Sequence, residues 1–211
     1  LLMRQFIVNN IGKISHPEAD DLMRIMQAKR IDDEIIDTLL ICEHEEIVTI
    51  GPRARNDGIK PPADYPTSPV DRGGGLTWHG PGQLVIYPIF KWDLDGESNV
   101  KAIISILEEW VIKSLSDNGI VATRDDRMQG VWIGQNKICS IGLSFLRWTS
   151  RHGLTINYNT PAGRVEMVSG CGLGQDTTTS LAALGIKLEK NAILDSLIDN
   201  SSLLGRQLFS E

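Results

Sequence analysis

The amino-acid sequence predicts an α+β protein folded as a single domain. Candidate strands and helices are mixed along the chain, without the regular β-α-β alternation of a doubly wound parallel sheet. The 211 residues, 41% of them hydrophobic, suffice for one domain with a substantial core. No internal repeat, low-complexity tract or linker divides the sequence, so residues 1–211 are expected to form one unit.

The first helix is predicted to follow a short strand at residues 6–8. Ser15 and Glu18 have the spacing of a capping box, and Pro17 suits the first turn of a helix. The apolar residues at helical spacing predict which face turns inward. That inward stripe is expected to contain Ala19, Leu22, Ile25 and Met26.

Two β-rich runs follow, at residues 38–42 and 47–50, and their spacing predicts a hairpin or two neighbouring strands. Residues 51–69 are rich in Pro, Gly, Asp and Arg, which is typical of a long loop. The apolar run at residues 84–89 predicts a buried strand.

The second half of the chain repeats this mixture. Apolar residues at helical spacing predict a helix from Val100 to Leu115, capped by Asn99 or Ser98. Residues 131–143 read as a β-hairpin with its turn at residues 134–136. A further strand at 154–158, a loop at 163–176 and a helix at 191–200 complete the prediction.

Composition excludes several classes of function. The net charge of −6 and the absence of any Lys/Arg cluster longer than two residues argue against nucleic-acid binding. No apolar run reaches the ~18 residues of a membrane span. The three cysteines have no paired spacing, which indicates a reducing compartment, without a disulfide framework or a zinc site. We therefore expect a cytoplasmic protein.

The stretch from Asp71 to Gln83 is unusual for its glycines, which include the consecutive Gly73, Gly74 and Gly75. Consecutive glycines cost backbone entropy on folding, so they suit a place where the backbone must approach a neighbour closely. Arg72 precedes them, and Thr77, Trp78 and His79 follow. The pattern predicts a backbone surface that lies against a ligand. The alternative is a glycine-rich hairpin turn.

Cys171 is the first candidate for chemistry. Gly170 and Gly172 leave its sulfur unshielded and its neighbouring N–H groups able to face an oxyanion. A thiol needs a nearby cation or hydrogen bond to form the nucleophilic thiolate. Cys139 is a rival nucleophile, whereas Cys42, which follows two apolar residues, suits a buried position.

Lys137 is the second candidate, because it begins an otherwise apolar strand. Burial of its stem would lower its pKa and let it act as a general acid or base. Cys139 lies two residues further on, so an extended strand would point both side chains to the same face. The alternative is an ordinary lysine at a strand edge. His79 and His152, each followed by glycine, suit loop-bracing or orienting roles.

His44 lies among Glu43, Glu45 and Glu46, which raises the question of a metal site. One polar turn offers too few converging ligands for such a site. We therefore expect no bound metal.

Several segments between about Thr38 and Leu181 resemble the lipoyl(octanoyl) transferases. Residues 72–83 look like the signature loop of that family, Arg-Gly-Gly-Gly-Leu-Thr-Trp-His-Gly-Pro-Gly-Gln. Residues 130–142 are similar to its block Gly-Val-Trp…Lys-Ile-(Ala/Gly)-(Ala/Ser)-(Ile/Leu)-Gly. Residues 152–157 are similar to His-Gly-(Leu/Phe)-Ala-Leu-Asn, and residues 40–44 to its Glu-His-Pro-Pro region, with Glu45-Glu46 in place of the prolines.

The resemblance implies a fold and a site. The fold is the α+β catalytic domain of biotin and lipoate protein ligases, a mixed sheet flanked by helices. Cys171 becomes the acyl-thioester nucleophile and Lys137 the residue that activates it. The implied substrate-binding residues are Arg72, Gly73, Gly74, Gly75, Leu76, Thr77, Trp78, His79, Ser140, Ile141, Gly142, Gly153, Leu154 and Thr155. No cofactor and no metal are implied. Gly170 departs from the proline that the family usually has before its cysteine.

The resemblance also implies a reaction and its partners. An octanoyl group moves from octanoyl-acyl carrier protein, through the Cys171 thioester, to a lysine of an apo lipoyl domain. The acceptors are the E2 subunits of 2-oxoacid dehydrogenases and the glycine cleavage H protein, with no nucleic-acid or membrane partner. A mitochondrial matrix location fits the same reaction in a eukaryote. Two alternatives stay open: an ATP-dependent lipoate or biotin protein ligase, and a non-catalytic relative that binds lipoyl domains.

Overall fold

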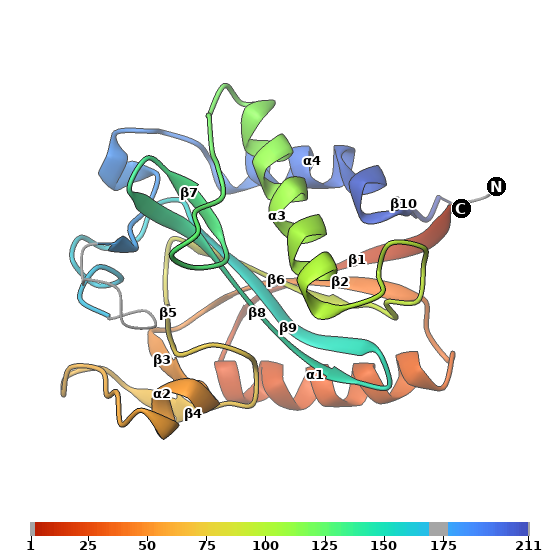
Figure 1. The fold of residues 1–211 in the computed structure, drawn as a ribbon, viewed down its shortest axis with the longest axis horizontal. Coiled ribbons are helices and arrows are strands. Elements are labelled where there is room, and N and C mark those ends of the chain that lie inside the picture. Colours follow the sequence, from red (N-terminus) through yellow and green to blue (C-terminus); the bar gives the residue numbers. More distant parts are fainter. Residues whose placement is uncertain (1–2, 169–176, 211) are drawn as a thin grey trace.

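The computed structural model describes residues 3–168 and 177–210 (Figure 1). Its helices are α1 (His16–Ile31), α2 (Pro52–Asn56), α3 (Val100–Ser116) and α4 (Lys190–Asp199), with short 3-10 turns at Ala182–Leu184 and Ser201–Leu204. Its strands are β1 (Arg4–Ile14), β2 (Asp37–His44), β3 (Ile47–Ile50), β4 (Thr67–Pro69), β5 (Leu76–His79), β6 (Gln83–Ile89), β7 (Val131–Ile133), β8 (Asn136–Leu146), β9 (Thr149–Asn157) and β10 (Arg206–Leu208).

A mixed seven-stranded sheet organises the fold. Its strand order is β10-β1-β2-β6-β9-β8-β7, and a separate three-stranded sheet has the order β4-β3-β5. In the large sheet β1 pairs in parallel with both β10 and β2, and the other neighbours are antiparallel. The predicted α+β class with a mixed sheet is confirmed.

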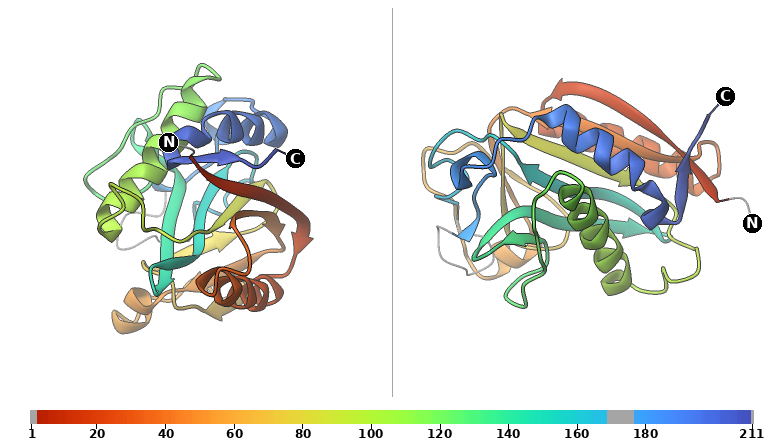
Figure 2. Two further views of the ribbon diagram at one scale, coloured as in Figure 1. Left: turned by 90° about the vertical axis from the view of Figure 1, so that its right-hand side faces the viewer. Right: turned by 90° about the horizontal axis from the view of Figure 1, so that it is seen from above.

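Helices cover both faces of the large sheet (Figures 1 and 2). Strand β2 illustrates why, because its side chains alternate between two apolar clusters. Leu39 and Ile41 belong to the core beneath α3 and α4. Leu40 and Cys42 point the other way and pack with Ala19 and other α1 residues. The central strands are therefore apolar on both sides.

The predicted helix starts are confirmed. The backbone N–H of Glu18 donates to Ser15 Oγ at 3.4 Å, and the Glu18 carboxylate accepts from Ser15 N–H at 3.3 Å. Asn99 caps α3 by accepting from Ala102 N–H at 2.9 Å. The prediction that Ile25 belongs to the inward stripe is wrong, because this residue is 56% exposed. Met23 takes the inward position instead, one turn after Ala19, so the buried stripe runs beside Ile25.

Three predictions from local sequence are wrong, because pairing with distant segments determines the structure of these residues. Residues 38–42 and 47–50 lie in different sheets, since β3 pairs with β4 and β5. The segment 51–69 contains the short α2 and β4. Residues 76–79, within the predicted glycine-rich loop, form β5.

The predicted hairpin of β7 and β8 is confirmed, and β9 starts earlier than expected, at Thr149. His152 therefore lies inside a strand. None of the helices in residues 3–168 and 177–210 combines the length and apolar character needed to cross a membrane.

Candidate active site

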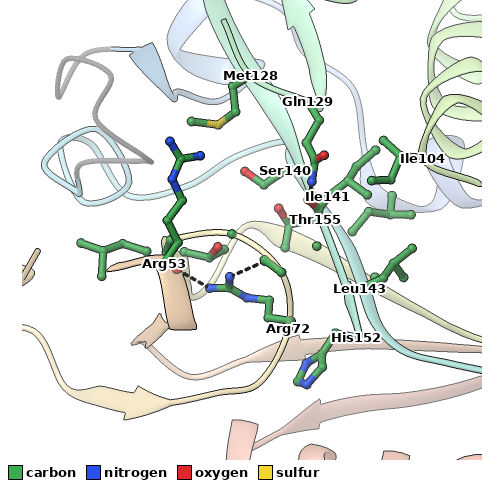
Figure 3. Close-up of a pocket in the computed structure, with 18 of the residues that line it drawn as sticks. Arg53, Arg72, Ile104, Met128, Gln129, Ser140, Ile141, Leu143, His152 and Thr155 are labelled. Atoms are coloured by element: carbon green, nitrogen blue, oxygen red, sulfur yellow. Dashed lines mark hydrogen bonds between the residues drawn. The ribbon is translucent and has the colours of Figure 1, made fainter. Parts of the chain in front are cut away.

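A cavity of about 430 Å³ lies between the glycine-rich segment and strands β8 and β9 (Figure 3). Its volume falls within the ~300–1,000 Å³ that is typical of small-molecule sites. The predicted site residues that line it are Arg72, Gly73, Gly74, Gly75, Leu76, Thr77, His79, Lys137, Ser140, Ile141, Gly142, Gly153, Leu154 and Thr155.

Two of the predicted site residues need separate mention. Trp78 is buried beside the cavity, in a smaller pocket, and its indole N–H donates to Glu46 at 3.0 Å. Cys171 falls in residues 169–176, outside the described part of the chain.

A close backbone contact joins the glycine-rich segment to β8. The Gly73 N–H donates to the carbonyl oxygen of Leu143 at 2.9 Å. A Cβ atom built on Gly142 would lie 2.7 Å from the carbonyl oxygen of Gly73, so no larger residue fits without displacing the backbone. Glycine at position 142 therefore lets the segment lie directly against the strand.

Arg72 ties the same segment to the small sheet. Its side chain is buried, and its guanidinium donates to Thr49 Oγ1 at 2.7 Å and to the Gly75 carbonyl at 3.1 Å. Figure 3 shows the guanidinium at the base of the cavity. The arginine thus bridges the backbone of the glycine-rich segment and strand β3.

Lys137 is buried and lines the cavity, and its ammonium contacts the Met128 sulfur at 2.6 Å. A bulge in β8 sets its direction, because Val131 pairs with Cys139 whereas Trp132 pairs with Lys137. The extra residue between them shifts the alternation of side chains. Lys137 and Ser140 therefore both border the cavity.

The bulge corrects the prediction that Lys137 and Cys139 share a face. Cys139 packs in the hydrophobic core and is fully buried, and this burial raises the pKa of its thiol. Burial and the nearby Glu43 carboxylate raise the pKa of the Cys42 thiol to about 12. Neither thiol is therefore suited to form a thiolate near neutral pH.

All four histidines of the chain cluster below the cavity. The His16 ring centroid lies 5.2 Å from that of His44, 5.4 Å from that of His79 and 6.2 Å from that of His152. Tyr87 completes the cluster and shares a 2.7 Å hydrogen bond with His44 Nε2. His79 and His152 line the cavity, so this cluster forms part of its base.

The environment keeps these imidazoles neutral. Burial beside His44, His152 and the Arg72 guanidinium lowers the pKa of His16 to about 3. Burial and the Arg151 guanidinium lower the pKa of His152 to about 4. Burial lowers the pKa of His79 well below its usual value. The orienting role predicted for His79 agrees with its 2.8 Å hydrogen bond to Gln83.

One group of potential metal ligands exists among the described residues. Asp20, Asp71 and His152 bring ligand atoms within 4.8 Å of one another. Arg151 forms ion pairs with both carboxylates, at 3.3 Å to Asp20 and 2.6 Å to Asp71. Arg24 also pairs with both, at 3.2 Å to Asp20 and 3.7 Å to Asp71. Two guanidinium charges therefore balance the two carboxylates, and the group is suited to an ion-pair network rather than to a cation.

The cavity also contains residues that sequence reasoning missed. These are Arg53, Tyr87, Val100, Ile104, Arg127, Met128, Gln129 and Leu143. Val100 and Ile104 share a face of α3, so helical periodicity could have suggested them. Met128 and Gln129 lie between predicted elements and had no such signal. Gln129 is held by donating to the Ile141 carbonyl at 2.9 Å.

Comparison with known families identifies the chain. Residues 18–199 match the sequence profile described as the lipoyl protein ligase A/B catalytic domain. The chain belongs to this family. The octanoyltransferase of Caldanaerobacter subterraneus subsp. tengcongensis is 35% identical over 206 residues, covering 93% of this chain and 89% of that protein. The octanoyltransferase of Chloroflexus aurantiacus is 38% identical over 189 residues, covering 85% of this chain and 84% of that protein.

Solved structures share the fold. A lipoate-protein ligase A bound with ATP superposes with a TM-score of 0.69 at 13% identity, covering all of this chain and 89% of that one. The biotin protein ligase from Aquifex aeolicus gives a TM-score of 0.55 at 12% identity, covering 96% of this chain and 69% of that one. The expected biotin and lipoate protein ligase fold is therefore confirmed.

The contact at Gly142 leads to a stability prediction. Gly142→Ala should lower the free energy of unfolding by about 1–3 kcal/mol, because the added methyl group overpacks against the Gly73 carbonyl. Gly73→Ala is the matched control, since its Cβ would meet Leu143 O at an ordinary 3.6 Å. Urea unfolding of both variants measures the difference in their free energies of unfolding. If the two variants are equally stable, the contact between Gly142 and the Gly73 carbonyl does not limit the size of residue 142.

The histidine cluster predicts a pH dependence. His16 titrates near 6.5 when unfolded and about 3 when folded, so the unfolded state binds the extra proton below pH 6.5. Stability is therefore lost as the pH falls from 7 to 5. The loss from His16 approaches about 1.4 kcal/mol per pH unit.

Urea unfolding at several pH values tests this dependence. His16→Gln should flatten the pH profile, whereas Met23→Ala, at a buried position on the same helix, should lower stability and keep the wild-type slope. Parallel profiles for His16→Gln and the wild type would refute the assignment.

Proposed function

We propose that this protein is an octanoyltransferase of lipoate biosynthesis. It transfers an octanoyl group from octanoyl-acyl carrier protein to a lysine of apo lipoyl domains. The acceptors are the E2 subunits of 2-oxoacid dehydrogenases and the glycine cleavage H protein. Family membership and the octanoyltransferases at 35–38% identity support this assignment.

The observation that carries the proposal is the position of Lys137 in the cavity. The lysine is buried and lines the same cavity as the apolar side chains of Ile104, Ile141 and Leu143. An octanoyl tail requires such an apolar wall, and each buried methylene contributes about 0.8 kcal/mol. Acyl transfer also requires a group that accepts and returns a proton beside the thioester.

In this mechanism Lys137 takes the proton of the Cys171 thiol, and the thiolate attacks the carbonyl carbon of the octanoyl thioester. A carbon–sulfur bond to Cys171 forms as the bond to the carrier's phosphopantetheine sulfur breaks. The departing thiolate takes the proton back from Lys137. The neutral amine of the acceptor lysine then attacks the carbonyl carbon of the acyl-enzyme, and the carbon–sulfur bond to Cys171 breaks as the amide forms. The proton that the amine loses passes through Lys137 to the Cys171 thiolate, which restores the thiol. Converting a thioester to an amide is favourable, so the reaction requires no ATP.

Arg53 and Arg127 at the cavity fit the donor. Both are exposed basic residues in a protein of net charge −6, and both line the same opening. Arg127 is paired with Asp125 at 2.8 Å, whereas Arg53 forms no ion pair among the described residues. Arg53 is therefore the basic charge at this opening that favours an acidic carrier protein. No sulfur nucleophile other than Cys171 suits the reaction, because the thiols of Cys42 and Cys139 are buried with raised pKa values.

Intact-protein mass after incubation with octanoyl-acyl carrier protein tests the proposal. The wild type should gain one octanoyl group without ATP, and Cys171→Ser should gain none. Cys139→Ser is the matched control and should still be acylated, because that thiol lies in the core. An adduct on Cys139 would refute the site. No adduct together with ATP-dependent transfer of free lipoate would favour a ligase.

A further inference from the structure

The hydroxyl of Thr155 has no role in the mechanism above. Among buried side chains in residues 3–168 and 177–210, those of Thr155, Thr160 and Glu166 have a polar atom without a hydrogen-bond partner. Of these, only Thr155 lines the cavity. Its side chain is 95% buried, since the residue is 5% exposed.

An unpartnered buried hydroxyl is costly. Leaving a buried donor or acceptor unsatisfied costs about 1–3 kcal/mol, whereas valine has nearly the same shape and no polar atom. Strand β9 would accept valine at this position, because β-branched residues suit strands. The hydroxyl therefore indicates a ligand that brings a polar atom to this point of the cavity.

The position of Thr155 shows which part of a ligand it would meet. Thr155 on β9 lies opposite Ser140 on β8, and Ser140 borders the cavity with Lys137. Figure 3 shows Ser140 and Thr155 projecting toward the side where Arg53 lies, whereas Ile104 and Leu143 lie on the other side. Met128, whose sulfur contacts the Lys137 ammonium at 2.6 Å, also lies on the side of Arg53 in Figure 3. The cavity is thus polar on that side and apolar on the opposite side.

An octanoyl thioester has the same polarity. Its tail is apolar, and the carbonyl oxygen is its one strong hydrogen-bond acceptor. When the tail contacts Ile104 and Leu143, the carbonyl lies on the polar side, where proton transfer by Lys137 also requires it. This match of polarity rests on the function proposed above.

We propose that the Thr155 hydroxyl donates a hydrogen bond to the carbonyl oxygen of the bound acyl group. The bond strengthens when the nucleophile adds to the carbonyl carbon and the electron pair of the C=O bond moves to oxygen. It persists until the carbon–sulfur bond of the leaving thiol breaks and the carbonyl is restored. The proton stays on Thr155 throughout, so the residue stabilises charge without transferring a proton.

Thr155→Val tests this role in a single-turnover acylation with octanoyl-acyl carrier protein. The rate constant at saturating donor should fall at least about tenfold, because the donor acts mainly on the negatively charged intermediate. The donor concentration at half-saturation should change by less than about twofold. The Tm should not fall, because the substitution removes an unsatisfied buried hydroxyl. Thr155→Ser keeps the hydroxyl and should acylate within about threefold of the wild type.

Thr38→Val is the matched control for a structural threonine. Thr38 is 1% exposed on β2, and its hydroxyl donates to the Ile36 carbonyl at 3.0 Å, away from the cavity. This variant should lose stability and keep the wild-type acylation rate. The two substitutions should therefore have opposite effects on stability and on rate.

The outcomes separate this inference from the proposed function. Wild-type acylation with an equally fast Thr155→Val overturns the role of Thr155 and leaves the proposed function intact. No acylation of the wild type overturns both. If Thr155→Val does not fold, the acylation rates of Thr155→Ala and Thr155→Ser are compared instead, because only the second keeps the hydroxyl. Equal acylation rates for these two variants likewise overturn the inference.

Discussion

The cavity depends on the backbone contact between Gly73 and Gly142. The Gly73 N–H donates to Leu143, and the missing Cβ of Gly142 leaves room for the Gly73 carbonyl. Arg72 fixes the other side of the same segment to strand β3. These contacts hold the small sheet against the large one and enclose the space between them. Without the contact at Gly142, the wall that faces β8 and β9 would move outward.

A second constraint decides which side chains enter that space. Without the bulge, Lys137 and Cys139 would share a face of β8, and Ser140 would point the opposite way. The bulge places Lys137 and Ser140 at the cavity and Cys139 in the core. The neutral histidines beneath add polar rings without adding charge. The site thus combines a buried lysine, a buried guanidinium, hydroxyls on neighbouring strands and an apolar wall.

Local sequence rules predicted much of this structure. Capping residues marked the starts of α1 and α3, and the turn at residues 134–136 marked the hairpin of β7 and β8. The consecutive glycines indicated a close backbone approach, which the Gly73–Gly142 contact explains. Each of these signals depends on neighbours in the sequence or on steric limits of the residue itself.

The remaining features depend on pairing between distant segments. The bulge in β8 arises from its register with β7, so alternation alone predicted the wrong direction for Cys139. Strand β10 forms only by pairing with β1 at the other end of the chain. Met128 lies in a loop and reaches the cavity through the fold around it. Cys171 lies outside the described residues, so its role remains a prediction.

The central claim is that the protein carries the acyl group covalently between its two substrates. The most direct test mixes isolated octanoyl-enzyme with an apo lipoyl domain in the absence of ATP and follows both proteins by mass over time. The account predicts that the octanoyl group leaves the enzyme and appears as an amide on the lipoyl domain, at least as fast as steady-state turnover. The account would be contradicted if the octanoyl group stayed on the enzyme while the enzyme still octanoylated the lipoyl domain in steady-state turnover.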